Sequence, residues 1–229
     1  MPDVTSFNYR LEYSKLGNMK FIGHIDLMKL FHKLFRMSGL PIAFSQGFNP
    51  HQIFTIAHPL SLGMEGLAEP ADFRLHASAD AGEIAVLLNA NAPTGLLVTN
   101  VRQLAPGEKN CAGLVAAADY TANAHGIPGL TQAAAGIMAA AEVIAAKRTK
   151  SGTTRDDIRK DIHSLAADDS GTVQMRLSAG SSANLKPQLV LSRLIADTGA
   201  DYDEYAHSFT RTRLLCRGDG GFEAIRVGS

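Results

Sequence analysis

The chain is poor in cysteine. Its two cysteines, Cys111 and Cys216, lie more than a hundred residues apart and have no close partner at metal-ligand spacing. Disulfide frameworks and cysteine-rich zinc sites both need several thiols at defined spacings, so this count argues against either. An iron-sulfur cluster needs a group of thiolates that this chain cannot supply alone. No cofactor or metal is therefore expected to be bound by the chain itself.

The chain also lacks net charge, with 22 Lys and Arg against 22 Asp and Glu. Residues 1–60 carry six basic and three acidic residues, residues 61–146 three and eight, and residues 147–229 thirteen and eleven. A dedicated nucleic-acid coat protein is much more basic than this. A local basic face can still neutralise a few phosphates, so the balance limits nucleic-acid binding without excluding it.

Long apolar runs and common catalytic motifs are missing as well. The N-terminus has no basic segment followed by an apolar one, and the longest apolar run, near residues 133–141, is too short to span a bilayer. We therefore predict a cytoplasmic protein with no membrane partner. The chain has no phosphate-binding loop, dinucleotide fingerprint, HExxH or nucleophile elbow, so common cofactor-dependent and hydrolytic activities have no support.

The 45% of hydrophobic residues is enough for a real core, and their spacing predicts the elements around it. Alternating aromatic and polar residues indicate a strand at 7–13, and a stripe through Leu27, Phe31 and Leu34 indicates a helix from His24 that stops at Gly39. The rest of the first half is predicted as strands at 41–44, 53–57, 71–77 and 96–104 and a helix at 80–90.

The second half is predicted to repeat this order. It has strands at 114–122, 158–165, 173–177 and 208–216, an Ala-rich helix at 130–146 and a helix from Pro187 through Ile195. Two β-α-β-β-α-β units predict an α+β fold of two tandem ferredoxin-like antiparallel sandwiches. The predicted domains are 1–108, which carries GHIDL and SQGFNPH, and 109–229, which carries a basic hairpin or linker at 147–160.

Residues suited to binding an anion gather before the first helix. Lys15 and Lys20 flank a turn, and His24 and Asp26 stand at the helix start, where backbone N–H groups favour a phosphate. His24 can equally be a capping or packing residue, and the helix dipole alone can account for Asp26. The helix also carries a set of cations along its polar face, namely Lys29, Lys33 and Arg36.

The loop SQGFNPH just after this helix is the second candidate. Gly47 allows a backbone conformation closed to other residues and Pro50 restrains Asn49, so the loop is stiff. A stiff polar loop can aim hydrogen-bonding groups and a stacking ring; the alternative is a rigid turn whose Phe48 plugs the core. The hydrogen-bonding candidates are Ser45, Gln46, Asn49 and His51, and Phe48 is the ring.

Two further arrangements remain open from spacing alone. His24 and His51 could act as an acid-base pair on RNA if the helix start and the loop form one pocket. Three carboxylates, Glu65, Glu69 and Asp72, could hold a divalent ion, although a solvated loop explains them as well.

Several of these segments, in order, resemble the bacterial radical-SAM-linked protein family. The resemblance rests on Lys15, Lys20-Phe21, GHIDL at 23–27, the helix end at 36–40, SQGFNPH at 45–51 and PLSLG at 59–63, and it continues more loosely through Asp72, 147–162 and 211–215. Gln52 stands where that family commonly has proline. The family is uncharacterised, and its members are fused to, or encoded beside, a radical SAM protein.

The resemblance implies a partner that carries SAM and an iron-sulfur cluster, which agrees with the cysteine count. By analogy with other radical SAM systems, the target is RNA. The leading hypothesis is an accessory, RNA-directed subunit of a radical SAM modification system. The alternatives are a stand-alone RNA-processing or RNA-modifying enzyme that uses His24 and His51, and a structural adaptor for the radical SAM protein.

Overall fold

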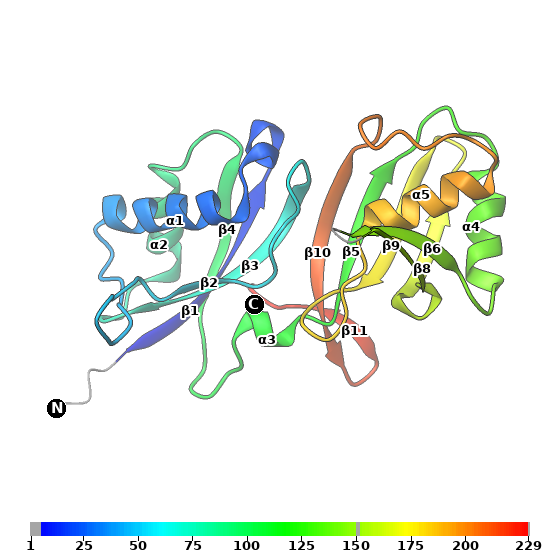
Figure 1. Cartoon of the computed structure of the whole chain (residues 1–229). Coiled ribbons are helices and arrows are strands. Elements are labelled where there is room, and N and C mark those ends of the chain that lie inside the picture. Colours follow the sequence, from blue (N-terminus) through cyan, green and yellow to red (C-terminus); the bar gives the residue numbers. More distant parts are fainter. Residues whose placement is uncertain (1–5, 150–151, 229) are drawn as a thin grey trace. The chain divides into compact units, whose positions relative to one another are not determined.

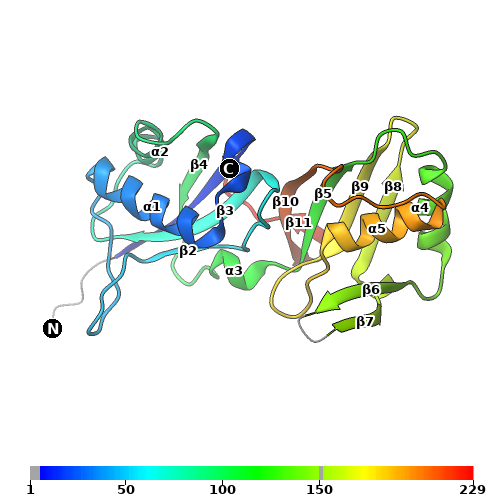
Figure 2. The same ribbon diagram turned by 45° about the horizontal axis from the view of Figure 1, so that its top comes forward.

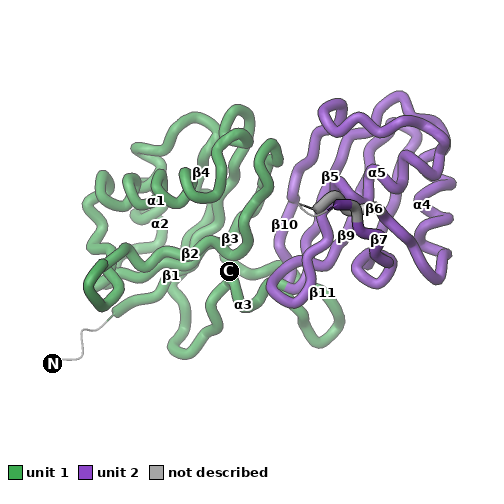
Figure 3. The backbone as a smooth tube through the Cα atoms, viewed as in Figure 1, with its two compact units in different colours: residues 1–115, 216–229 green, residues 116–215 purple. Residues whose placement is uncertain are grey.

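The alternation of aromatic and polar residues near the N-terminus forms strand β1 (Phe7–Lys15), whose Tyr9, Leu11 and Tyr13 are buried. The computed structural model describes residues 6–149 and 152–228. It divides the chain into two compact units (Figure 3). Unit 1 comprises residues 1–115 and 216–229, and unit 2 comprises residues 116–215. The sequence placed a boundary at 108 and assigned the C-terminal residues to the second domain, whereas their contacts assign residues 216–229 to unit 1.

Unit 1 is built on an antiparallel sheet in the order β4-β1-β3, with β2 also paired to β3. Helices α1 and α2 pack on one face of this sheet (Figure 1). After β1, its elements are η1 (Gly17–Phe21), α1 (His24–Ser38), β2 (Phe54–Ile56), β3 (Glu65–Leu75), α2 (Ala81–Asn89), β4 (Leu96–Gln103), α3 (Cys111–Leu114) and β11 (Gly221–Ala224).

The core of unit 1 is rich in aromatic rings. Phe31 and Phe35 of α1 contact Phe54 with ring centroids 4.7 and 5.5 Å apart, and Phe35 lies 5.1 Å from Phe73. Tyr9 stacks on Phe73 at 5.4 Å. Offset and edge-on ring pairs add to the free energy gained by burying the rings, so these contacts fix α1 against the sheet. The helix ends as predicted, because Gly39 adopts φ 70° just after its last turn.

Unit 2 has an antiparallel sheet in the order β10-β5-β9-β8, with α4 and α5 on one face (Figure 1). Strands β6 and β7 pair with each other in the region predicted as a basic hairpin or linker, of which residues 150–151 lie outside the described residues. The elements are β5 (Ala117–Asn123), α4 (Leu130–Ala139), β6 (Ile144–Thr149), β7 (Gly152–Asp157), η2 (Arg159–Asp161), β8 (Ile162–Ala167), β9 (Thr172–Ser178), α5 (Pro187–Asp197) and β10 (Phe209–Gly218).

The coarse fold prediction is confirmed, since the protein is mixed α+β with predominantly antiparallel sheets. The Ala-rich helix was predicted too long. It ends at Ala139 because the Arg159 guanidinium donates to the carbonyls of Met138 and Ala140 at 2.8 and 3.2 Å, which satisfies the end of α4 from outside the helix. The segment predicted as its last turns pairs with β7 as β6.

Two other predicted elements also differ. The strand predicted at 41–44 is reduced to isolated bridges at Ile42 and Phe44. The three carboxylates predicted in a loop belong to β3, where Glu69 and Asp72 are buried. In the described part of the chain, no helix is long and apolar enough to cross a membrane.

Candidate functional site

The SQGFNPH loop forms the tip of a narrow hairpin, residues 44–52, which we call the Phe48 hairpin. At its neck the Ser45 N–H donates to the His51 carbonyl at 2.8 Å, and the His51 N–H donates to Ser45 Oγ at 3.1 Å. Ser45 Oγ also lies 2.8 Å from His51 Nδ1. Gly47 provides the bend with φ 119°. The loop is therefore ordered by its own hydrogen bonds, as its composition predicts.

Phe48 at the tip does not plug the core. Its relative exposure is 112%, so the whole ring stands in solvent. Gln46 and Asn49 on either side of it are exposed as well. A large exposed aromatic ring on a fixed loop gains nothing for folding, because it keeps all its apolar surface in water. The ring is therefore free to stack on, or insert into, another molecule.

The second half of α1 lies close to this hairpin. Burial lowers the pKa of His32 on α1, and the nearby charges of His51 and Arg36 lower it further, so these three residues are within electrostatic range of one another. The Nε2 atom of His32 is buried and has no hydrogen-bond partner among the described residues. The same holds for Oε1 of Gln52, a side chain only 5% exposed at the base of the hairpin.

Sequence reasoning missed His32 and Gln52. His32 sits beside the apolar stripe of α1 and reads as a packing residue; indeed its ring lies 6.2 Å from that of Phe54. The sequence feature that could have drawn attention to Gln52 is that it stands where the radical-SAM-linked family commonly has proline. A buried glutamine retains a polar atom that proline lacks, and this atom is the one left without a partner.

The residues predicted to bind an anion at the start of α1 do not form one common binding site. Lys15 is 1% exposed, and its Nζ donates to the Lys20 carbonyl at 3.4 Å, so Lys15 supports the turn and cannot present its charge to a ligand at the surface. Lys20 lies over the Phe21 ring at 5.3 Å. Asp26 is exposed and pairs with Lys29 at 3.1 Å. His24 is exposed at the first position of α1.

The start of α1 and the Phe48 hairpin do not converge into one pocket. They lie at opposite ends of α1 (Figure 2), a helix of 15 residues, which corresponds to roughly 20 Å. His24 and His51 therefore cannot share a proton-transfer site in this structure. The structure joins instead the hairpin residues Ser45, Gln46, Gly47, Phe48, Asn49 and His51 with the exposed Arg36 and, one turn away on α1, Lys33.

The acidic residues after Gly63 serve the fold. Asp72 accepts from Arg10 Nε and Nη2 at 2.7 and 3.0 Å and from the Cys111 N–H at 2.7 Å. Glu65 accepts from the Gly17 N–H at 2.8 Å. Within residues 6–149 and 152–228, no group of three or more His, Cys, Asp or Glu is arranged to hold a metal ion.

The Arg10–Asp72 pair also contacts Glu108 and Cys111, and we call these four residues the Arg10 cluster. Glu108 accepts from Arg102 and lies 3.5 Å from Arg10 Nη1, and the Arg102 hydrogen bond is the main reason that its pKa falls to about 2. Burial, together with the negative charge of Asp72, raises the pKa of the Cys111 thiol, which therefore stays protonated. These contacts tie the segment around α3 to the sheet of unit 1.

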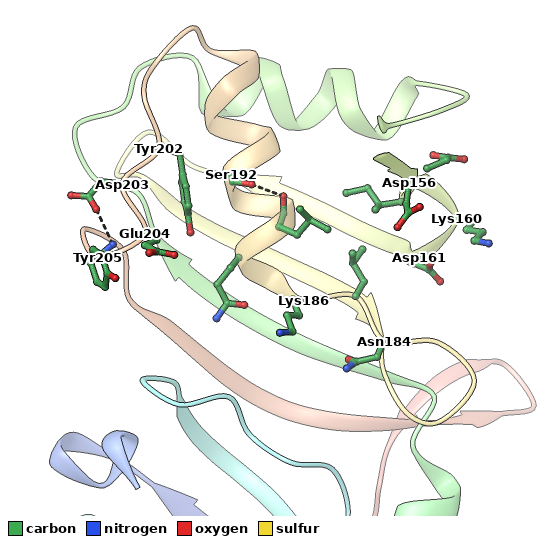
Figure 4. Close-up of a pocket in the computed structure, with 15 residues that line it drawn as sticks. Asp156, Lys160, Asp161, Asn184, Lys186, Ser192, Tyr202, Asp203, Glu204 and Tyr205 are labelled. Carbon is green, nitrogen blue, oxygen red and sulfur yellow. Dashed lines mark hydrogen bonds between the residues drawn. The ribbon is translucent and has the colours of Figure 1, made fainter. Parts of the chain in front are cut away.

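Unit 2 contains a separate cleft of about 1310 Å³ (Figure 4). Its walls are the end of β7 with η2, the residues that lead into α5 with the first turns of that helix, and the loop at 202–205. Two polar atoms in these walls, Gln188 Oε1 and Tyr202 OH, are buried and have no partner in the described part of the chain. Single-sequence reasoning missed this cleft because its residues come from three segments without a shared motif.

Comparison with known proteins places the chain in a family. The model of a family described as "Uncharacterized protein conserved in bacteria (DUF2344)" matches residues 8–187, well over half of the chain. The chain belongs to this family. No curated protein matches it.

The match to the DUF2344 family covers the Phe48 hairpin, the Arg10 cluster and all of α1. It ends at Pro187, the first residue of α5. One side of the unit 2 cleft thus lies within the matched residues and the loop at 202–205 lies beyond them. The prediction of an uncharacterised bacterial family is confirmed.

Proposed function

We propose that this protein is an accessory, RNA-directed subunit of a radical SAM modification system, and that the Phe48 hairpin contacts the RNA. The radical SAM partner would carry SAM and the iron-sulfur cluster, and this chain would have no catalytic step of its own. The observation that carries the proposal is the fully exposed Phe48 ring on an internally hydrogen-bonded loop, whose His51 acts electrostatically on His32 of α1, one turn before the exposed Arg36.

We infer that each unit is a ferredoxin-like sandwich. In both units, the strands run fourth, first, third and second across the sheet, as β4-β1-β3-β2 and β10-β5-β9-β8, with two helices on one face. RNA-binding domains with this topology commonly stack bases on aromatic residues of the open sheet face. In unit 2 the open face presents Asp119, Gln174 and Arg176, and Arg176 is bound to Asp119 at 2.7 Å. None of these side chains has an aromatic ring, and the Arg176 guanidinium is held by Asp119, which favours the hairpin as the RNA contact.

Stacking and charge would act together at the hairpin. An exposed ring that stacks on an unpaired base contributes about 1–3 kcal/mol to binding and discriminates little between bases. Lys33 and Arg36 are exposed on the half of α1 nearest the hairpin and would neutralise phosphates. Lys29 and Lys20 lie nearer the helix start, where they could extend the contact, whereas Lys15 is buried and is removed from the proposed interface.

Binding of purified full-length protein to total tRNA and to rRNA fragments tests this proposal. We expect Phe48→Ala to weaken binding by about tenfold, from the loss of one stacking contact. Affinity should also fall as salt rises. The matched control is Tyr205→Ala, which removes another largely exposed ring, from unit 2. Wild-type binding no stronger than that of an unrelated neutral protein at low salt would contradict the proposal.

A second candidate function is a structural adaptor that binds the radical SAM protein and no substrate. The start of α1 favours it, because Phe21, Ile25 and Leu62 are exposed there, and the Gly63 N–H donates to the Lys20 carbonyl at 2.9 Å, which brings the turn of Leu62 next to Phe21. Co-purification with crosslinking from the native host decides between the two. If the protein is an adaptor, the radical SAM protein should co-purify with it and RNA should not. Ile25→Ser should then weaken that complex.

The hypothesis of a stand-alone enzyme has the least support of the three. It required His24 and His51 to share a proton, but the start of α1 and the Phe48 hairpin, which carry them, lie at opposite ends of that helix (Figure 2). Turnover of RNA by the purified chain that is lost in His51→Ala would revive this hypothesis.

A further inference from the structure

The cleft of unit 2 has polar walls with an excess of negative charge. Five carboxylates line it, from Asp156, Asp157, Asp161, Asp203 and Glu204, against two lysines, Lys160 and Lys186. Asp157 accepts from the backbone N–H groups of Val143 and Arg159, which lower its pKa and keep it ionised. Phosphate groups would be repelled here, so the cleft is unsuited to the RNA backbone proposed for the hairpin of unit 1.

The acidic residues fall into two groups. In Figure 4, Asp203 and Glu204 lie on one side of the first turns of α5, and Asp156 and Asp161 lie on the other. A ligand with a single positive charge would meet only one group. A ligand that crosses the start of α5 with positive charges spaced along it would meet both.

Two buried atoms in the walls lack partners. Gln188 Oε1 can only accept a hydrogen bond, and Tyr202 OH can accept or donate one. Burial, with added repulsion from Glu204 and Asp203, raises the pKa of Tyr202, so its hydroxyl stays neutral. The Tyr202 ring is held in place by stacking on His207 at 5.3 Å. A bound donor such as a guanidinium or ammonium group would satisfy both atoms.

The start of α5 offers a hydrogen-bond donor as well. The Leu189 N–H bonds to the Lys186 carbonyl and Pro187 has no N–H, but the Gln188 N–H lies in the first turn, where a helix offers no acceptor. Lys186 adds a positive charge beside it. A polyamine carries donors only. A polypeptide carries cationic side chains and backbone carbonyls, so it can satisfy both the acidic groups and the start of α5.

We propose that this cleft binds a basic polypeptide segment of a partner protein, whose Arg or Lys side chains meet the two acidic groups and whose backbone carbonyls face the start of α5. The size of the cleft agrees with this, because about 1310 Å³ exceeds the roughly 300–1,000 Å³ of typical small-molecule sites. The inference does not depend on the RNA proposal, which concerns unit 1.

The test uses the full chain and a fluorescein-labelled peptide of repeated Arg-Ala-Ala triplets, with a Glu-Ala-Ala peptide for comparison. Binding is followed by fluorescence anisotropy at low and physiological ionic strength. We expect the Arg peptide to bind and the Glu peptide not to bind. Asp161→Asn combined with Glu204→Gln should weaken binding about tenfold. The matched control, Glu142→Gln with Asp169→Asn, neutralises two exposed acids outside the cleft and should leave binding unchanged.

Tyr202→Phe gives a second readout. It removes a buried hydroxyl without a partner, so it should raise the melting temperature and at the same time weaken peptide binding. A purely structural role for Tyr202 would not produce this opposite pair of changes. An unchanged affinity would overturn the assignment of its hydroxyl to the ligand.

Other outcomes would overturn the whole inference. These are equal affinity for the Arg and Glu peptides, no effect of the cleft double variant, or loss of RNA binding in that variant. Spermidine binding with the same sensitivity, in the absence of peptide binding, would make the cleft a polyamine site. Phe48→Ala should leave peptide binding intact, so failure here is distinguishable from failure of the RNA proposal.

Discussion

Arg10 carries a positive charge into the interior of unit 1, where it is only 1% exposed and forms two hydrogen bonds to Asp72. Arg10→Ala leaves the Asp72 carboxylate buried without its counter-ion, so we expect the free energy of unfolding to fall by about 3–5 kcal/mol. Urea unfolding measures this. Arg74→Ala is the comparison, because the partly exposed Arg74 side chain donates to the neutral Asn8 side chain, and the change should stay below about 1 kcal/mol. Equal losses in both variants would show that burial of the pair is irrelevant.

Glu108 makes unit 1 sensitive to acid. Its pKa falls from an ordinary 4.5 to about 2 in the folded protein, chiefly through its hydrogen bond to Arg102. A depressed pKa means that the ionised form favours folding. The contribution is complete above the unfolded pKa and is lost as the pH falls from about 4.5 towards 2. Urea midpoints of wild type and Glu108→Gln should therefore differ at neutral pH and converge below this window; a constant difference would contradict the assignment.

At the scale of elements, the Phe48 hairpin depends on one hydroxyl. Ser45→Ala removes the acceptor of the His51 N–H and the partner of His51 Nδ1. We expect amides in residues 44–52 to exchange about fivefold faster, equivalent to about 1 kcal/mol, with little change in global stability because the hairpin is exposed. Hydrogen exchange measures both. Ser164→Ala, at an exposed serine of unit 2, should change neither; a global loss of stability in Ser45→Ala would show that the hairpin belongs to the core.

Helices whose start or end is marked by nearby residues were predicted well. Helix α1 combines an apolar stripe with a terminal glycine, and α2 begins after Asp80, whose side chain accepts from the Glu83 N–H at 3.0 Å. Helix α4 was overextended because alanine favours a helix wherever it occurs, and the residue that ends it, Arg159, is twenty positions after Ala139. A distant cap of this kind leaves no trace in the local pattern.

At the scale of the whole molecule, the C-terminal residues complete unit 1. Ile225 and Val227 are buried, and the Arg226 carbonyl accepts from Arg102 Nε and Nη2 at 3.3 and 3.2 Å. Removing residues 219–229 should destabilise unit 1 by about 3–5 kcal/mol, from the loss of two buried side chains and these hydrogen bonds. Hydrogen exchange should show lost protection in β1 and β4 and retained protection in β5 and β9. The double variant Ile225→Ala, Val227→Ala should reproduce most of the effect, and equal losses in both units would contradict this division.

The local features of the candidate site were predicted from the sequence, but the way in which they come together was not. The stiff loop, its exposed polar residues and the cations of α1 were all readable from composition and spacing, because each depends on neighbours in the chain. The sequence did not predict that Lys15 is buried, or that a buried side-chain atom of His32 and one of Gln52 lack a hydrogen-bond partner in the described part of the chain. They depend on which surfaces α1 and the sheet cover.

The amino-acid sequence by itself determined where β1, α1 and α2 form, that the chain contains only two thiols, and that residues 45–51 make an ordered turn. Periodicity, residue counts and backbone restraint are properties of short segments, so no tertiary information was needed. Only the tertiary structure decided that the start of α1 and the Phe48 hairpin stand a helix length apart, and that three distant segments of unit 2 enclose an acidic cleft. Distances between remote segments follow from packing, and a single sequence does not contain them.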